Sequence, residues 1–249
     1  PVGVGSNLIV RDGGINGVVI RLGRNFANVE VGEDFIIAGA AALDSRVAEK
    51  AAENGIDLSF LRTIPGTIGG AIKMNAGCYG SCISDVLVSA DVILRSGEIQ
   101  TFYPEDLNFT YRASGLPEES IVVQARLKGK KRLPTQIISQ MRSNQAQRSE
   151  TQPIREKTCG STFKNPVDFI NVKEHKNADQ IKAWHLIDKV GLKGFSIGGA
   201  TVSSLHSNFL INTGSATADD VESLGEYIQK KVFQETSIKL EWEVRRVGV

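Results

Sequence analysis

The chain has 249 residues, enough for a full core and for two lobes, because single hydrophobic cores stop growing at roughly 250 to 300 residues. Its 29 Lys and Arg residues nearly balance 28 Asp and Glu residues, so charge favours neither a nucleic-acid nor a membrane-surface partner. No apolar run approaches the ~20 residues that a bilayer-spanning helix needs, and no signal peptide is visible, although the chain begins at Pro1 rather than Met.

The first part of the chain is predicted to alternate short strands with loops and one helix. β-Branched runs between glycines predict buried strands at residues 17–22 and 35–38. A helix is predicted over residues 44–54, with Asp44 as its N-cap and Gly55 as its C-cap. Its apolar face consists of Val47, Ala48, Ala51 and Ala52.

Residues 64–77 are the most informative stretch, being too glycine-rich for a helix and too apolar for a solvated linker. Glycine accepts a positive φ and has no Cβ, so such a loop can direct several backbone N–H groups at one phosphate. A second loop of this kind, residues 3–7, opens the chain. Together the loops predict a dinucleotide ligand. Neither has the Rossmann fingerprint, so we expect the ligand to be held in another way.

Three cysteines, Cys78, Cys82 and Cys159, are an odd number for a disulfide framework and indicate reduced cytosolic thiols. No His or further Cys near Cys78 and Cys82 completes a zinc-binding set. We therefore expect no metal site and interpret both thiols as small packing residues.

The following segments predict an α+β first half with a mixed or antiparallel sheet. Strands are predicted at residues 86–94, 99–102 and 121–127, with a tight turn at Ser96-Gly97 between the first two. A helix is predicted at residues 135–147. The polar stretch after it, residues 148–157, marks the predicted domain boundary.

The second part begins with a loop at residues 160–166, followed by a helix that ends at Gly191 and short strands at 200–202 and 209–211. Thr217-Ala218-Asp219-Asp220 is a capping-box arrangement that begins another helix. Its predicted core face is Val221, Leu224, Ile228 and Val232. The last predicted strand, residues 238–244, alternates apolar and polar side chains.

Six motifs in sequence order resemble those of the UDP-N-acetylenolpyruvoylglucosamine reductase family, and the resemblance runs from end to end. They are Gly3-Val4-Gly5-Ser6-Asn7, Ile64-Pro65-Gly66-Thr67-Ile68-Gly69-Gly70 with Asn75-Ala76-Gly77, Tyr111-Arg112-Ala113-Ser114, Gly160-Ser161-Thr162-Phe163-Lys164-Asn165-Pro166, Ser203-Ser204-Leu205-His206-Ser207-Asn208 and Glu243-Val244-Arg245. The family's flavin domain is similar to the vanillyl-alcohol-oxidase (PCMH) type, in which glycine loops outside a Rossmann unit hold FAD. Family members carry several dozen residues before the first of these loops, and we expect that part to be absent here. No long tyrosine-bearing insertion lies between Gly194 and Thr217, which indicates the shorter, second type of the family.

The resemblance implies an α+β protein with an FAD-binding region at residues 1–150, joined by a C-terminal strand at 238–249, and a smaller α+β substrate-binding domain at 151–237. It implies a cytoplasmic flavoenzyme of bacterial peptidoglycan synthesis that takes hydride from NADPH and reduces an enolpyruvyl ether on a UDP-sugar. NADPH and the sugar nucleotide are expected to use the same pocket in turn, with no nucleic-acid, membrane or obligate protein partner. The implied cofactor-binding residues are Gly3, Gly5, Ser6, Asn7, Pro65, Gly66, Gly69, Gly70, Asn75, Ala76 and Gly77.

The implied reaction needs a cation or acid at the substrate carboxylate and a proton donor at carbon, because hydride addition leaves an enolate-like anion. By resemblance, Arg112 and Glu243 form the carboxylate-stabilising pair and Ser161 is the proton donor. The implied substrate contacts are Tyr79, Lys164, Asn165 and His206.

The residues alone leave other interpretations open. Ser161 also suits a turn, Arg112 a salt bridge, His206 a hydrogen-bonded structural role and Tyr79 core packing. Glu241 and Glu243 share one face of the predicted strand, so only the family motif selects Glu243. The competing functions are a nucleotide-binding protein of the same fold without reductase activity and a small-molecule flavin oxidase.

Overall fold

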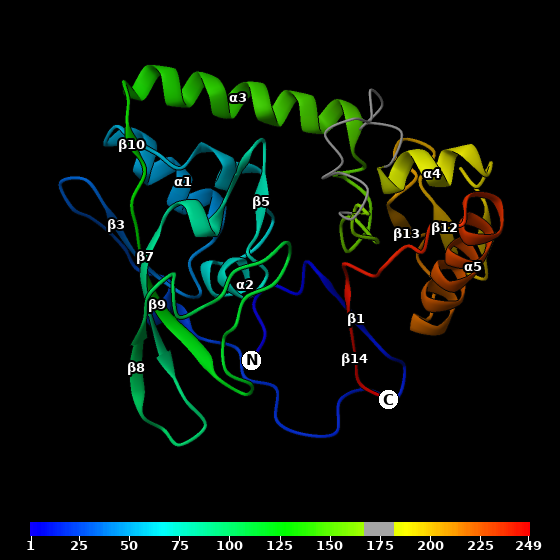
Figure 1. The fold of residues 1–249 in the computed structure, drawn as a ribbon, viewed down its shortest axis with the longest axis horizontal. Helices are drawn as coiled ribbons and strands as arrows, with labels where there is room; N and C mark the ends of the chain where they lie inside the picture. The colour runs from blue at the N-terminus through cyan, green and yellow to red at the C-terminus, as the bar shows by residue number, and fades with distance from the viewer. Residues whose placement is uncertain (167–181) are drawn as a thin grey trace. The chain divides into compact units, whose positions relative to one another are not determined.

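The computed structural model describes residues 1–166 and 182–249, which form two compact units (Figure 1). Unit 1 consists of Pro1–Gly5 and Val19–Arg148, and unit 2 of Ser6–Val18 and Ser149–Val249. The predicted division placed residues 238–249 with the first region, whereas the structure places them in unit 2. The reason is that β14 (Arg245–Val247) pairs in parallel with β1 (Leu8–Val10), which also belongs to unit 2.

Unit 1 is built on an antiparallel sheet, as the α+β pattern predicted, with β9 as its central strand. In sheet order the strands are β2 (Val29–Val31), β3 (Ile36–Gly39), β9 (Ile121–Leu127), β7 (Leu87–Ile93) and β8 (Ile99–Phe102). Unit 1 also contains two separate two-stranded sheets: β4 (Ile56–Asp57) with β10 (Lys130–Lys131), and β5 (Gly77–Cys78) with β6 (Ser81–Cys82).

Helices pack against this sheet and complete one apolar core. The helices of unit 1 are α1 (Asp44–Glu53), α2 (Ile68–Lys73) and α3 (Pro134–Thr151), with 3₁₀ turns η1 (Arg24–Phe26), η2 (Ser59–Thr63) and η3 (Ile83–Asp85). The predicted apolar face of α1 is fully buried. Asp44, however, is the first helical residue and is buried, and Leu43 occupies the N-cap position.

Two further expectations for unit 1 are corrected by the structure. The glycine-rich stretch does contain a helix, α2, because an added Cβ at Gly69 would lie 3.1 Å from the Ala40 Cβ, so glycine lets the helix pack closely. Residues 17–22 form no strand: Val18 is 86% exposed, and the chain passes from unit 2 to unit 1 here without a partner strand.

Unit 2 has its own apolar cluster beneath a small antiparallel sheet and two helices. Its elements, besides β1 and β14, are α4 (Ala183–Lys189), β11 (Ser196–Ile197), β12 (Ala200–Val202), β13 (Leu210–Asn212) and α5 (Ala218–Thr236). The predicted capping box at the start of α5 is present, with Thr217 accepting from the Asp220 N–H. Leu224, Ile228 and Val232 are buried as expected.

The C-terminal segment 238–244 alternates in burial as predicted, but it lies outside the assigned strands. Leu240 and Val244 are buried, and an isolated bridge joins Trp242 to Phe163. Backbone hydrogen bonds of residues 238–244 go to the short stretch around Phe163 rather than to a long strand. Regular strand pairing therefore begins only at β14. None of the helices described is both long and apolar enough to cross a membrane.

Substituting Gly225 in α5 by Ala is expected to destabilise unit 2 by about 1–3 kcal/mol. An added Cβ would lie 2.1 Å from Cη2 of the Trp242 ring, so the rigid indole must move. Urea unfolding followed by Trp fluorescence measures the change. The control is Gly23→Ala, where an added Cβ meets nothing within 4 Å; equal stability of both variants would contradict the expectation.

Candidate active site

The two glycine loops meet in unit 1. An added Cβ at Gly3 would lie 2.6 Å from the Thr67 Oγ1, so the first loop approaches the second too closely for any side chain. The chain then leaves unit 1 after Gly5, which has a φ of 76°. The two glycine loops therefore lie against each other at Gly3 and Thr67.

Backbone hydrogen bonds to the segment 42–44 hold the second loop, and two of the loop's own N–H groups remain without a partner in the described residues. The Asp44 N–H donates to the Gly66 carbonyl at 3.1 Å, and the Ile68 N–H donates to the Ala42 carbonyl at 3.0 Å. Within the described residues, the N–H groups of Gly66 and Thr67 between these bonds have no hydrogen-bond partner. Paired free N–H groups in a glycine loop suit a phosphate, so the residues fit the diphosphate of FAD.

Three of the expected site residues of unit 1 have positive φ although none is glycine: Asn75 at 39°, Tyr79 at 53° and Arg112 at 59°. Such conformations cost free energy and persist where the surroundings hold them, often at functional sites. Arg112 Nη2 donates to the Gly77 carbonyl at 3.1 Å, which holds the guanidinium at the end of the glycine stretch. Tyr79 donates its hydroxyl to the Asn144 carbonyl at 2.9 Å.

The side chain of Asn75 is occupied by the protein itself. Its Nδ2 donates to the Thr110 carbonyl at 3.1 Å, and its Oδ1 accepts from the Ser84 N–H at 3.0 Å. The Asn75 N–H also donates, to the Ile72 carbonyl at 3.2 Å, so these bonds hold Asn75 within the loop.

Arg148, at the end of unit 1 in α3, is a residue that the sequence analysis missed. Its guanidinium donates to the Thr63 carbonyl and lies near Cys78 and Tyr79. Burial lowers the pKa of Arg148, and no carboxylate pairs with it among the described residues. The polar stretch that begins at Arg148 was interpreted only as a boundary, and a half-buried unpaired cation cannot be recognised from sequence.

In unit 2, a short extended segment brings three of the six motifs together. The Thr162 N–H donates to the Asn208 carbonyl at 2.8 Å, and on the other side the Glu243 N–H donates to the Thr162 carbonyl at 2.8 Å. Ser161 forms an isolated bridge with Phe209. Ser161 and Glu243 are 82 residues apart in sequence, but Ser161 is next to Thr162 in the chain, and Thr162 is hydrogen-bonded to Glu243.

The later part of the first glycine loop reaches the same place in unit 2. Asn7 Nδ2 donates to the Glu243 carbonyl at 3.2 Å, and the Arg245 N–H donates to the Asn7 carbonyl at 3.0 Å. The Ser6 carbonyl lies 3.9 Å from an added Cβ at Gly160. An expected cofactor-binding residue and an expected catalytic residue are therefore neighbours.

The three expected substrate contacts of unit 2 have structural partners. Lys164 forms an ion pair with Glu241 at 3.4 Å, and Asn165 Oδ1 accepts from the Ala183 N–H at the start of α4. His206 Nδ1 accepts from the Asn208 N–H at 3.3 Å, and burial lowers the pKa of His206, favouring the neutral ring. This bond is compatible with a structural role for His206, because it holds Asn208, whose carbonyl accepts from the Thr162 N–H.

The cysteines are free and half-buried. Burial raises the pKa of Cys78 and raises that of Cys159 to about 11, so both thiols are protonated at neutral pH. Within residues 1–166 and 182–249, no cluster of His, Cys, Asp and Glu could hold a metal ion.

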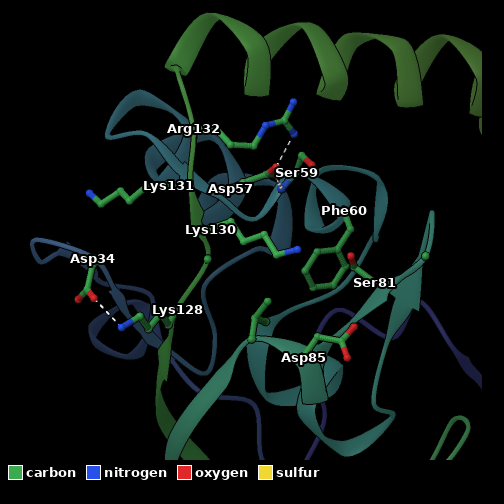
Figure 2. A pocket seen from close by; sticks show the side chains of 13 residues that line it. Asp34, Asp57, Ser59, Phe60, Ser81, Asp85, Lys128, Lys130, Lys131 and Arg132 are labelled. Carbon is green, nitrogen blue, oxygen red and sulfur yellow. Dashed lines mark hydrogen bonds and ion pairs between the residues drawn. The ribbon is translucent and has the colours of Figure 1, made fainter.

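Unit 1 also contains a cavity of about 930 Å³ (Figure 2). None of the expected site residues lines it. Its cations are largely compensated, because Lys128 pairs with Asp34 and Arg132 pairs with Asp57, each at 2.6 Å. Lys130 extends into the hollow opposite Asp85, so little net charge remains to select a ligand.

Comparison with known proteins covers both units. The family described as "UDP-N-acetylenolpyruvoylglucosamine reductase, C-terminal domain" matches residues 152–247, and the "FAD binding domain" family matches residues 1–103. A reductase of that name from Ruegeria pomeroyi is 54% identical over 248 residues, which cover all of this chain and 80% of the relative. The chain belongs to the UDP-N-acetylenolpyruvoylglucosamine reductase family. A second member, from Cereibacter sphaeroides, is 52% identical over the same span.

A solved structure agrees with this membership. The crystal structure of the Thermus caldophilus reductase superposes with a TM-score of 0.84 at 35% identity, covering 99% of this chain and 84% of that one. The predicted family, the FAD-binding α+β fold and the flavin cofactor are thereby confirmed.

Substituting Gly3 by Ala is expected to weaken FAD binding about 10-fold or more, because its Cβ would overlap the Thr67 Oγ1 and separate the two loops. Thr67→Ala removes that oxygen, after which the next loop atom is farther away. The double variant should therefore recover much of the affinity lost by Gly3→Ala, relative to Thr67→Ala alone. Flavin fluorescence titration measures the FAD dissociation constants of the three variants. If the losses of binding free energy in the two single variants simply add in the double variant, the Gly3 Cβ and the Thr67 Oγ1 do not clash.

Proposed function

We propose that this chain uses FAD and NADPH to reduce UDP-N-acetylglucosamine enolpyruvate to UDP-N-acetylmuramate, a step of peptidoglycan precursor synthesis. Its membership of the reductase family over its whole length supports this activity. The observation that carries it is the pairing of the Ser161 and Glu243 segments through Thr162, beside a loop residue, Asn7, expected to reach the cofactor.

The chemistry assigns a role to each group. FAD, held by the glycine loops, would supply the hydride-transfer chemistry, by which hydride from NADPH would reach the vinyl carbon distal to the substrate carboxylate. Negative charge then spreads from the proximal carbon into that carboxylate. Arg112 stabilises this charge together with Glu243, and Ser161 Oγ gives its proton to the proximal carbon.

The half-buried Arg148 guanidinium supplies a second cation in unit 1. A buried cation without a carboxylate partner favours binding of an anion, because the anion restores the lost compensation. In this proposal it binds an anionic group of NADPH or of the sugar nucleotide, which each occupy the same pocket in turn.

Ser161→Ala should leave flavin reduction by NADPH unchanged and slow flavin reoxidation by the enolpyruvyl substrate by about 100- to 10,000-fold, since only the second half-reaction needs the proton. Anaerobic stopped-flow absorbance of the flavin measures both half-reactions. Ser223→Ala, on α5, is the control. Normal turnover by Ser161→Ala would remove the proton-donor assignment.

The same substitution, Glu to Gln, at position 243 and at position 241 distinguishes the roles of the two residues. Glu243→Gln should lower kcat by about 10- to 100-fold, because a group that stabilises developing charge is lost. Glu241→Gln should leave kcat within about 2-fold, because its pair with Lys164 is largely solvent-exposed. Steady-state kinetics with purified substrate measures kcat for both variants. A larger loss of kcat in Glu241→Gln than in Glu243→Gln would assign the role to Glu241.

A further inference from the structure

Asp44 is an exception among the buried residues of α1. The other buried side chains of that helix are Val47, Ala48, Ala51 and Ala52, all apolar. Asp44 has 0% of its surface exposed, and neither carboxyl oxygen has a hydrogen-bond partner in the described residues. Such a group opposes folding, and an apolar side chain of similar size would not.

The carboxyl group lies directly beneath the flavin loop. An added Cβ at Gly66 would be 2.7 Å from Asp44 Oδ2, so the oxygen occupies the space that a side chain at Gly66 would take. The Asp44 N–H is bonded to the Gly66 carbonyl, and the flanking residue Leu43 bridges Thr67. The start of α1 is therefore joined directly to the loop by backbone contacts.

The electrostatics are compatible with an anion on the other side of the loop. Burial raises the pKa of Asp44 well above its usual range, which favours the neutral acid. A neutral carboxyl group beneath the loop does not repel a diphosphate above it, and it offers both an O–H donor and a carbonyl acceptor.

We infer that Asp44 is a positioning residue for FAD: its carboxyl group supports the Gly66–Thr67 backbone so that the two free N–H groups face the diphosphate. This inference rests on the flavin site proposed for unit 1. It explains why a carboxyl group occupies a position where packing alone would favour an apolar side chain. Proteins tolerate such a loss of folding stability where a loop must be held in place for a ligand.

The test uses the whole chain with its flavin removed and then restored by titration with FAD. Asp44→Asn keeps the size, neutrality and hydrogen-bonding capacity of the group and should bind FAD within about 3-fold of the unchanged protein. Asp44→Leu should melt at the same temperature or higher, yet its FAD dissociation constant should rise about 10-fold or more. The control is Arg46→Leu, which removes an exposed charge from the same turn of α1 and should change neither value.

Three results would overturn the inference: Asp44→Leu binding FAD normally, Asp44→Asn losing as much affinity as Asp44→Leu, or affinity and melting temperature falling together in Asp44→Leu. The last result assigns Asp44 to folding alone. Asp44→Ala replaces the Leu variant if the larger side chain prevents folding. Failure of the unchanged protein to bind FAD would instead overturn the proposed function itself.

Discussion

The site in unit 2 depends on one short extended segment that is hydrogen-bonded on both sides. Thr162 accepts from the Glu243 N–H and donates to the Asn208 carbonyl, while Asn208 also binds Phe163 through its side chain at 3.0 Å and 2.8 Å. Because backbone hydrogen bonds fix register, this segment determines which residues of the flanking motifs become neighbours. The Trp242 ring, 5.1 Å from that of Phe163, packs on the same segment and joins the site to the core of α5.

Elements with a long, regular pattern could be predicted from the sequence. The bounds of β9 agree with the prediction, and α5 begins at its capping box, because periodicity and local capping decide these elements without help from the rest of the fold. Residues 17–22 have the same β-branched composition as a buried strand but form no strand. The Ile20 carbonyl accepts a hydrogen bond from the Val2 N–H at 2.9 Å, but no regular ladder follows, because strand pairing is not encoded locally. The helix α2 was missed because Gly69 serves close packing against Ala40 rather than a flexible turn.

For the site, the sequence motifs identified the family and its chemistry but not the geometry. Within the part of the chain that the structure describes, Arg148 has no carboxylate partner and the Asp44 carboxyl group has no hydrogen-bond partner. Both residues are also at least partly buried, and neither property can be deduced from spacing in the sequence. Asn165 and His206 are predicted substrate contacts, and in the structure their side chains accept hydrogen bonds from backbone N–H groups. A motif residue can therefore be needed because it shapes the loop, in addition to any contact with a ligand.

The pairing of β1 with β14 has a consequence for synthesis. Leu8 and Arg245 are 237 positions apart, so the ribosome must add all of the residues between them before β1 finds its neighbour. At about 5–20 residues per second, that interval is on the order of ten to fifty seconds. The sheet of unit 1 is complete by Leu127 and can form meanwhile, whereas the Leu8-Ile9-Val10 edge stays unprotected in the nascent chain. A translation product that stalls before β14 would thus carry an exposed, aggregation-prone strand edge.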